Sequence, residues 1–214
     1  VAYRDDIAAL SPDHIWRFDA DTLDSAGSLD ATGSAFNVGA GAAITEDATN
    51  SSGPTTTAGR AVLTTAATVD QALSRKAIGG WVMINSIQPP PKSLYREGTT
   101  NNQLCFVCWA GNNLMLDIVD GATVLQLFAD QPLAPNREYH VLALFSGTGF
   151  DDTLQLYVDG VLQGELAPGL ASLSSRAVGE WGDPSSTTEV GNRTVLLNAA
   201  VTSRYAFWAS WGNK

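Results

Sequence analysis

The chain has 214 residues, of which 44% are hydrophobic and 16% charged, so it is large enough for one compact domain with a core. Its 22 acidic residues outnumber its 12 basic residues, which gives a formal net charge of −10 at pH 7. Such an acidic surface repels a phosphate backbone and an anionic membrane, and no apolar run is long enough to span a bilayer, so neither nucleic acid nor a membrane is expected as a partner.

The first predicted elements lie before residue 20. Residues 7–10 predict a short helical turn that ends at Pro12. Residues 14–19 alternate in the way of a strand that is buried on one face. Residues 1–6 lack the charged-then-apolar layout of a signal peptide, so either this route is not used or processing has already occurred.

Acidic residues gather where this strand gives way to a loop: Asp19, Asp21, Asp24 and Asp30. Carboxylate and hydroxyl oxygens are the ligands that Ca²⁺ prefers, but the spacing does not match an EF-hand loop. Clustered acids in a loop are also commonly just solvated. Calcium and a solvated loop therefore both stay open, and no other cofactor is expected.

The stretch from about residue 20 to 60 is rich in Ala, Gly, Ser and Thr, with turn signals at residues 25–28 and 50–54. Local alternation at 36–38 and 42–44 favours short strands between long loops. A partly disordered segment is the alternative.

From residue 60 onward the sequence predicts strands at 60–63, 77–84, 103–110, 113–119, 123–128, 139–145, 153–158 and 204–211. Asp120-Gly121 and Asp159-Gly160 separate neighbouring strands and favour type I′ hairpin turns. No crossover helix is evident. The expected fold is therefore all-β, an antiparallel sandwich of two sheets or a jelly roll, in a single domain over residues 1–214.

A search for catalytic residues finds no convincing set. A glycosidase needs two carboxylates facing each other across a cleft, and no alternating acids on one strand supply them. His14 and His140 both fall inside predicted strands, and no nucleophile elbow is present. Cys105 and Cys108 have the spacing of half a zinc site without a second ligand pair, so they are interpreted as ordinary thiols. No enzymatic activity is expected.

Trp181 is the strongest candidate for ligand binding, with Glu180 and Asp183 beside it. Its neighbours are turn formers, which predicts a loop that runs into Pro184. An exposed tryptophan on a loop can stack on a sugar ring or anchor a protein contact. The alternative is that it folds back and caps one end of the sandwich.

Several segments resemble one known family. Residues 78–83 with 93–98, and residues 137–144 leading into the LYVDGVL hairpin at 156–162, are similar to strands of the concanavalin-A-like, laminin-G-like jelly-roll family. The resemblance implies a jelly-roll sandwich, and mostly non-catalytic modules that bind glycans or proteins, some with calcium at one rim. Enzymes among the relatives carry a Glu-x-Asp-x-Glu-like strand, which is absent here. Similar domains continue after the closing strand, which leaves room for this one to extend past Lys214.

A looser resemblance concerns residues 10–16, which are similar to the N-termini of laminin-G-like domains in bacteriophage structural proteins. It implies a virion surface component, as a capsid decoration or a tail or fibre part. Its partners would then be other virion proteins, further copies of itself and a host-surface glycan. The alternative is a carbohydrate-binding module of a secreted bacterial protein, and a third hypothesis is a glycoside hydrolase with unrecognised acids.

Overall fold

A computed structural model gives the architecture of the chain. It describes residues 8–16, 23–27, 30–34, 55–56, 60–64, 72–84, 92–99, 102–108, 110–174, 176, 178–182, 187–190, 193–196 and 203–212. Within these ranges, no helix has the length and apolar character that crossing a membrane requires.

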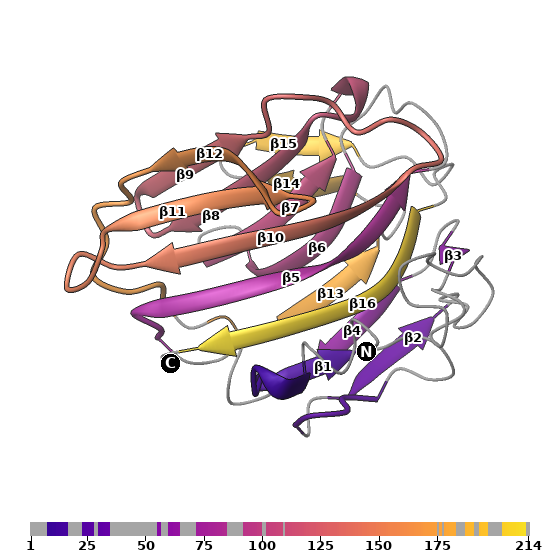
Figure 1. Ribbon diagram of the computed structural model, residues 1–214, viewed down its shortest axis with the longest axis horizontal. Coiled ribbons are helices and arrows are strands. Elements are labelled where there is room, and N and C mark those ends of the chain that lie inside the picture. The colour runs from indigo at the N-terminus through magenta and orange to yellow at the C-terminus, as the bar shows by residue number, and fades with distance from the viewer. Residues whose placement is uncertain are drawn as a thin grey trace.

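Two antiparallel sheets form the body of the domain, one behind the other in Figure 1. Sheet A contains, in spatial order, β1 (His14–Trp16), β16 (Ser203–Gly212), β5 (Arg75–Ile84), β10 (Glu138–Ser146), β11 (Thr153–Val158) and β12 (Val161–Leu166), with β3 (Thr55–Thr56) also paired to β16. Sheet B contains β2 (Ala31–Ser34), β4 (Arg60–Thr64), β13 (Val178–Gly182), β6 (Lys92–Thr99), β7 (Asn102–Cys108), β8 (Leu114–Asp120) and β9 (Thr123–Phe128). The predicted all-β sandwich of two antiparallel sheets is confirmed.

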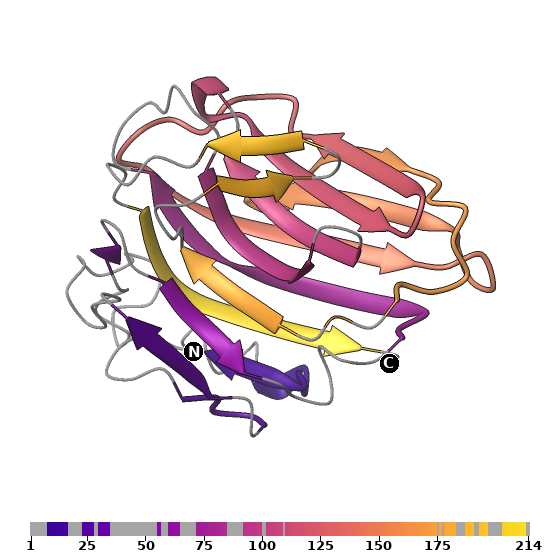
Figure 2. The ribbon, with the colours of Figure 1, turned by 180° about the vertical axis from the view of Figure 1, so that it is seen from behind.

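Two small elements complete the described structure. The hairpin of β14 (Thr187–Val190) and β15 (Arg193–Leu196) forms a separate two-stranded sheet. Figure 2 shows this hairpin in front of sheet B when the molecule is seen from behind. A short 3-10 helix, η1 (Ala110–Asn112), links β7 to β8.

The core lies between the sheets because each long strand turns alternate side chains toward the other sheet. Along β10 and β11 fully buried positions alternate with half-buried ones. Phe106 and Leu116 of sheet B meet Val141 and Leu156 of sheet A in this core, all four with no exposed surface. The half-buried positions of β10 and β11 therefore lie on the outer face of sheet A, which is turned away from sheet B.

The two predicted hairpin turns have different outcomes. At Asp159-Gly160 both residues have positive φ, 51° and 74°, as a type I′ turn requires, and that prediction is confirmed. At the other turn Asp120 pairs with Thr123, so the central residues are Gly121 and Ala122 rather than Asp120-Gly121. Of these two only Gly121 has positive φ, at 58°, so the type I′ assignment there is wrong.

The N-terminal elements agree in part with the prediction. Residues 8–9 form a helical turn ahead of Pro12, as expected. The strand that follows is β1, whose three residues are all buried, so over residues 14–16 it is not buried on one face alone. Residues 17–19 of the predicted strand lie outside the described residues. The strands expected at 36–38 and 42–44 lie outside the described residues.

A cluster of charges is buried between the sheets near the start of β5. Lys76 Nζ lies 2.7 Å from Glu97 Oε1, and the Tyr95 hydroxyl donates to the same oxygen at 2.8 Å. Arg176, which is 2% exposed, lies beyond them, with its Nη2 3.6 Å from Asp120 Oδ2. Burial raises the pKa of Tyr95 well above its usual value and lowers the pKa of Arg176, while the Glu97 charge raises both.

Candidate functional site

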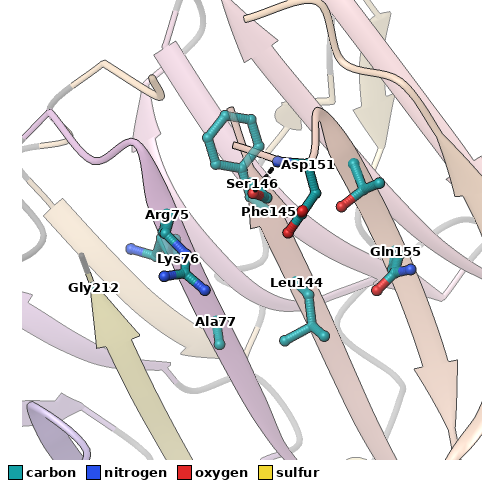
Figure 3. A pocket seen from close by; sticks show the side chains of 10 residues that line it. Arg75, Lys76, Ala77, Leu144, Phe145, Ser146, Asp151, Gln155 and Gly212 are labelled. Atoms are coloured by element: carbon teal, nitrogen blue, oxygen red, sulfur yellow. Dashed lines mark hydrogen bonds between the residues drawn. The ribbon is translucent and has the colours of Figure 1, made fainter. Parts of the chain in front are cut away.

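A hollow of about 190 Å³ opens on the outer face of sheet A. It lies where β5 begins, β10 ends and β11 begins, as the close view in Figure 3 shows. The side chains that matter for its chemistry are Arg75, Ala77, Leu144, Ser146, Asp151 and Gln155.

Strand register places the lining residues of this hollow in two rows. Leu144 pairs with Ala77 on one side and with Gln155 on the other, which forms one row across β5, β10 and β11. Paired residues of antiparallel strands project from the same face. The next row is Arg75, Ser146 and Thr153, formed by the same pairing two residues along. The floor is therefore aliphatic at Ala77 and Leu144 and polar around it.

The loop at residues 147–152 forms one wall and is anchored to neighbouring backbone. Gly147 N–H donates to Ser74 O and Thr148 N–H donates to Leu170 O, both at 2.9 Å. A Cβ at Gly147 would lie 2.1 Å from the Ala171 carbonyl oxygen, so only glycine fits this close approach. The loop is thus held in place before any ligand arrives.

Asp151 and Phe150 are the side chains that this loop presents. The Asp151 N–H donates to Ser146 Oγ at 3.3 Å, the contact drawn in Figure 3. The Arg75 guanidinium lies 5.3 Å from the centre of the Phe150 ring, within the range of a cation–π contact. Phe150 is 56% exposed, so an aromatic surface stands beside Arg75, which lines the hollow.

The residues predicted to bind a ligand are not brought to this hollow. Glu180 and Trp181 belong to β13 in sheet B, where Trp181 pairs with Ala61 of β4 and Tyr95 of β6. The predicted loop is therefore wrong for these two residues, because backbone pairing on both sides outweighs the turn-forming character of their neighbours. Asp183 lies outside the described residues. A role of the three in ligand binding stays a prediction.

Of the four acids proposed for calcium, Asp19 and Asp21 lie outside the described residues. Asp24 is buried, and its Oδ1 accepts hydrogen bonds from the N–H groups of Ile15, Ala26 and Gly27 at 2.9–3.1 Å. Its Oδ2 lies 2.5 Å from His14 Nδ1. Asp30 accepts from the Asp24 N–H at 2.9 Å. The Asp24 carboxylate thus fastens β1 to the following loop, and among the described residues no three His, Cys, Asp or Glu side chains form a group that would hold a metal.

Asp24→Ala is expected to lower the free energy of unfolding by about 2 kcal/mol or more, because it leaves several N–H donors without an acceptor in the folded protein. Urea denaturation followed by tryptophan fluorescence measures the change. Asp130→Ala, at an exposed position, is the matched control and should unfold like the parent. If the two variants unfold alike, Asp24 does not hold this end of the domain.

The two cysteines are both buried, and each is a thiol rather than part of a disulfide. Cys108 belongs to the core between the sheets, whereas Cys105 lies on the opposite face of β7. Burial raises the pKa of the Cys108 thiol to about 12. The interpretation of this pair as ordinary packing thiols is therefore supported.

No protein-family model and no curated protein sequence matches the chain. Solved structures do. The binding domain of botulinum neurotoxin serotype G superposes with a TM-score of 0.66 at 11% identity, covering 95% of this chain and 48% of that one. The serotype D/C VPI 5993 binding domain gives a TM-score of 0.67 at 10% identity, covering 94% and 48%.

A third structure comes from botulinum neurotoxin type C, whose cell entry depends on interaction with two ganglioside molecules. It has a TM-score of 0.66 at 10% identity, covering 96% of this chain and 49% of that one. At such identities the likeness defines the class of fold, a two-sheet β-sandwich, and nothing finer. This chain spans about half the length of each of these structures.

Proposed function

We propose that this domain is a non-catalytic carbohydrate-binding module that holds a saccharide in the hollow on sheet A. The observation that carries the proposal is the pair of rows across β5, β10 and β11. Ala77 and Leu144 offer an aliphatic floor, and Arg75, Ser146 and Asp151 surround it with donors and acceptors. A sugar ring has the matching character, with C–H groups on its faces and hydroxyl groups at its edge. Few convergent polar groups around an apolar surface are typical of small-molecule sites.

The hollow has too few acidic residues for hydrolysis, which favours a binding function. Of its lining residues only Asp151 is acidic. Both retaining and inverting glycosidases use a pair of carboxyl groups that flank the scissile bond. The likeness in fold to domains described as binding domains points the same way.

The same likeness favours the secreted module over the virion component. One of the compared structures comes from botulinum neurotoxin type C, whose cell entry depends on interaction with gangliosides, which are glycolipids. A place on a virion surface, by contrast, rests on the sequence, chiefly the resemblance of residues 10–16, and not on the structures compared above. We therefore propose an extracellular location, with a glycan as the partner.

Arg75→Ala and Asp151→Ala are each expected to weaken saccharide binding by about tenfold or more, since each removes a charged hydrogen-bonding group. A glycan array identifies the saccharides that bind, and calorimetry measures the affinities of the parent and the variants. Arg137→Ala and Asp130→Ala, at exposed positions outside the hollow, are the matched controls and should bind like the parent.

Loss of binding in the controls, or full binding by both hollow variants, would place the saccharide elsewhere. Release of reducing sugar from a bound polysaccharide would contradict the non-catalytic assignment.

A further inference from the structure

Beside the hollow, three side chains on the outer face of sheet A form a continuous hydrogen-bonded chain. The Tyr157 hydroxyl donates to Gln155 Oε1 at 3.1 Å. The Gln155 Nε2 group donates in turn to Glu165 Oε2 of β12. Both ends of the Gln155 carboxamide are therefore held, which fixes which way its oxygen and nitrogen point.

Gln155 joins this chain to the hollow, because it also lines the hollow. Tyr157 lies two residues further along β11, about 7 Å away at the rise of an extended strand. It stands in a third row across the sheet, since it pairs with Leu142 of β10 and with Leu162 of β12. Leu162 is 45% exposed and Tyr157 is half-buried, so this row offers an aromatic ring flanked by aliphatic side chains at the surface.

We infer that the ligand is an oligosaccharide that occupies two subsites, the hollow and the Tyr157 row, with Gln155 contacting the sugars in both. This inference rests on the proposed function. The second subsite repeats the composition of the first, an apolar surface beside fixed polar groups, and an aromatic ring provides a flat surface for a sugar face.

The charges around the two subsites indicate an uncharged oligosaccharide. Of the two basic residues that line the hollow, Lys76 is paired with Glu97 and Arg75 is offset by Asp151. Glu165 adds a further carboxylate beside Gln155. The chain as a whole has a net charge of −10. An acidic sugar would therefore meet no excess of positive charge on this face.

Calorimetry with neutral gluco-, manno- and galacto-oligosaccharides, each as monomer, dimer, trimer and tetramer, tests the inference. For the series that binds, the parent protein should gain about tenfold in affinity between monomer and trimer. Tyr157→Ala should remove this gain, because the second subsite loses its aromatic surface. Tyr157→Phe, which keeps the ring, should retain most of it. Val161→Ala, at the exposed tip of the same hairpin, is the control and should behave like the parent.

Three outcomes would overturn the inference. The first is equal affinity of the parent for monomer and trimer, and the second is an unchanged gain in Tyr157→Ala. The third is stronger binding of an acidic oligosaccharide than of its neutral counterpart. In each of these the hollow still binds a sugar and the proposed function stands. If no saccharide binds, the proposed function is contradicted, and so is the inference that rests on it.

Discussion

Glu97→Gln is expected to lower the free energy of unfolding by about 3–5 kcal/mol, because it removes the negative charge from a cluster that is closed off between the two sheets. Glu97 is 1% exposed and Lys76 is 7% exposed, and their side chains meet at 2.7–2.8 Å. With glutamine in place, the Lys76 ammonium group would stay buried without a carboxylate beside it. Arg176 would also lose one of the charges that raise its pKa.

Chemical denaturation followed by tryptophan fluorescence measures this effect at neutral pH. Asp130→Asn, the same carboxylate-to-amide change at an exposed position, is the control and should leave the denaturation midpoint unchanged. Equal stability of Glu97→Gln and the parent would mean that water reaches these charges in the folded protein.

Gly147→Ala is expected to weaken saccharide binding about tenfold or more by displacing the wall of the hollow. The added Cβ would lie 2.1 Å from the Ala171 carbonyl oxygen, which is backbone, so the loop at residues 147–152 has to shift. Asp151 and Phe150 would move with it, away from the row that holds Ser146. A one-ångström displacement of positioned groups is enough for such losses.

Gly149→Ala provides a close control in the same loop, because no atom lies within 4 Å of the position its Cβ would take. Calorimetry of both variants with the same saccharide, and denaturation curves to verify folding, separate a displaced wall from a general loss of structure. Normal binding by Gly147→Ala would show that the loop does not form part of the site.

The sequence predicts the fold well where strands are long and alternate. The strand predicted at 153–158 coincides with β11, and that at 123–128 coincides with β9. In β11 the apolar residues at every second position, Leu154, Leu156 and Val158, leave one way to pack against the opposite sheet. The prediction at 139–145 falls short of β10 by one residue at each end, since hydrogen bonding continues past the last apolar residue.

β13 is a strand that the local sequence pattern does not predict. Its residues, VGEWG, contain two glycines, which weaken a strand and are typical of turns. Only the presence of β4 on one side and β6 on the other makes this segment a strand, and those neighbours lie far from it in the chain. The prediction of an exposed tryptophan on a loop followed from the local pattern alone.

The hollow was missed for a related reason. Arg75, Ser146 and Thr153 come from three strands, and nothing in their local sequence marks them as neighbours. The register of β5, β10 and β11 brings them into one row. The LYVDGVL hairpin was the available signal, because it holds Tyr157 and follows Gln155, but in the sequence it indicated only the fold.

The most direct test of the central claim is a ¹H–¹⁵N NMR titration of the whole chain with the tightest-binding neutral oligosaccharide. We predict that chemical shift changes concentrate at Ala77, Leu144, Ser146, Asp151, Gln155 and Tyr157, across β5, β10 and β11 of sheet A. Changes concentrated instead at Glu180 and Trp181 in β13 of sheet B would contradict the account, because the ligand would then occupy the other sheet.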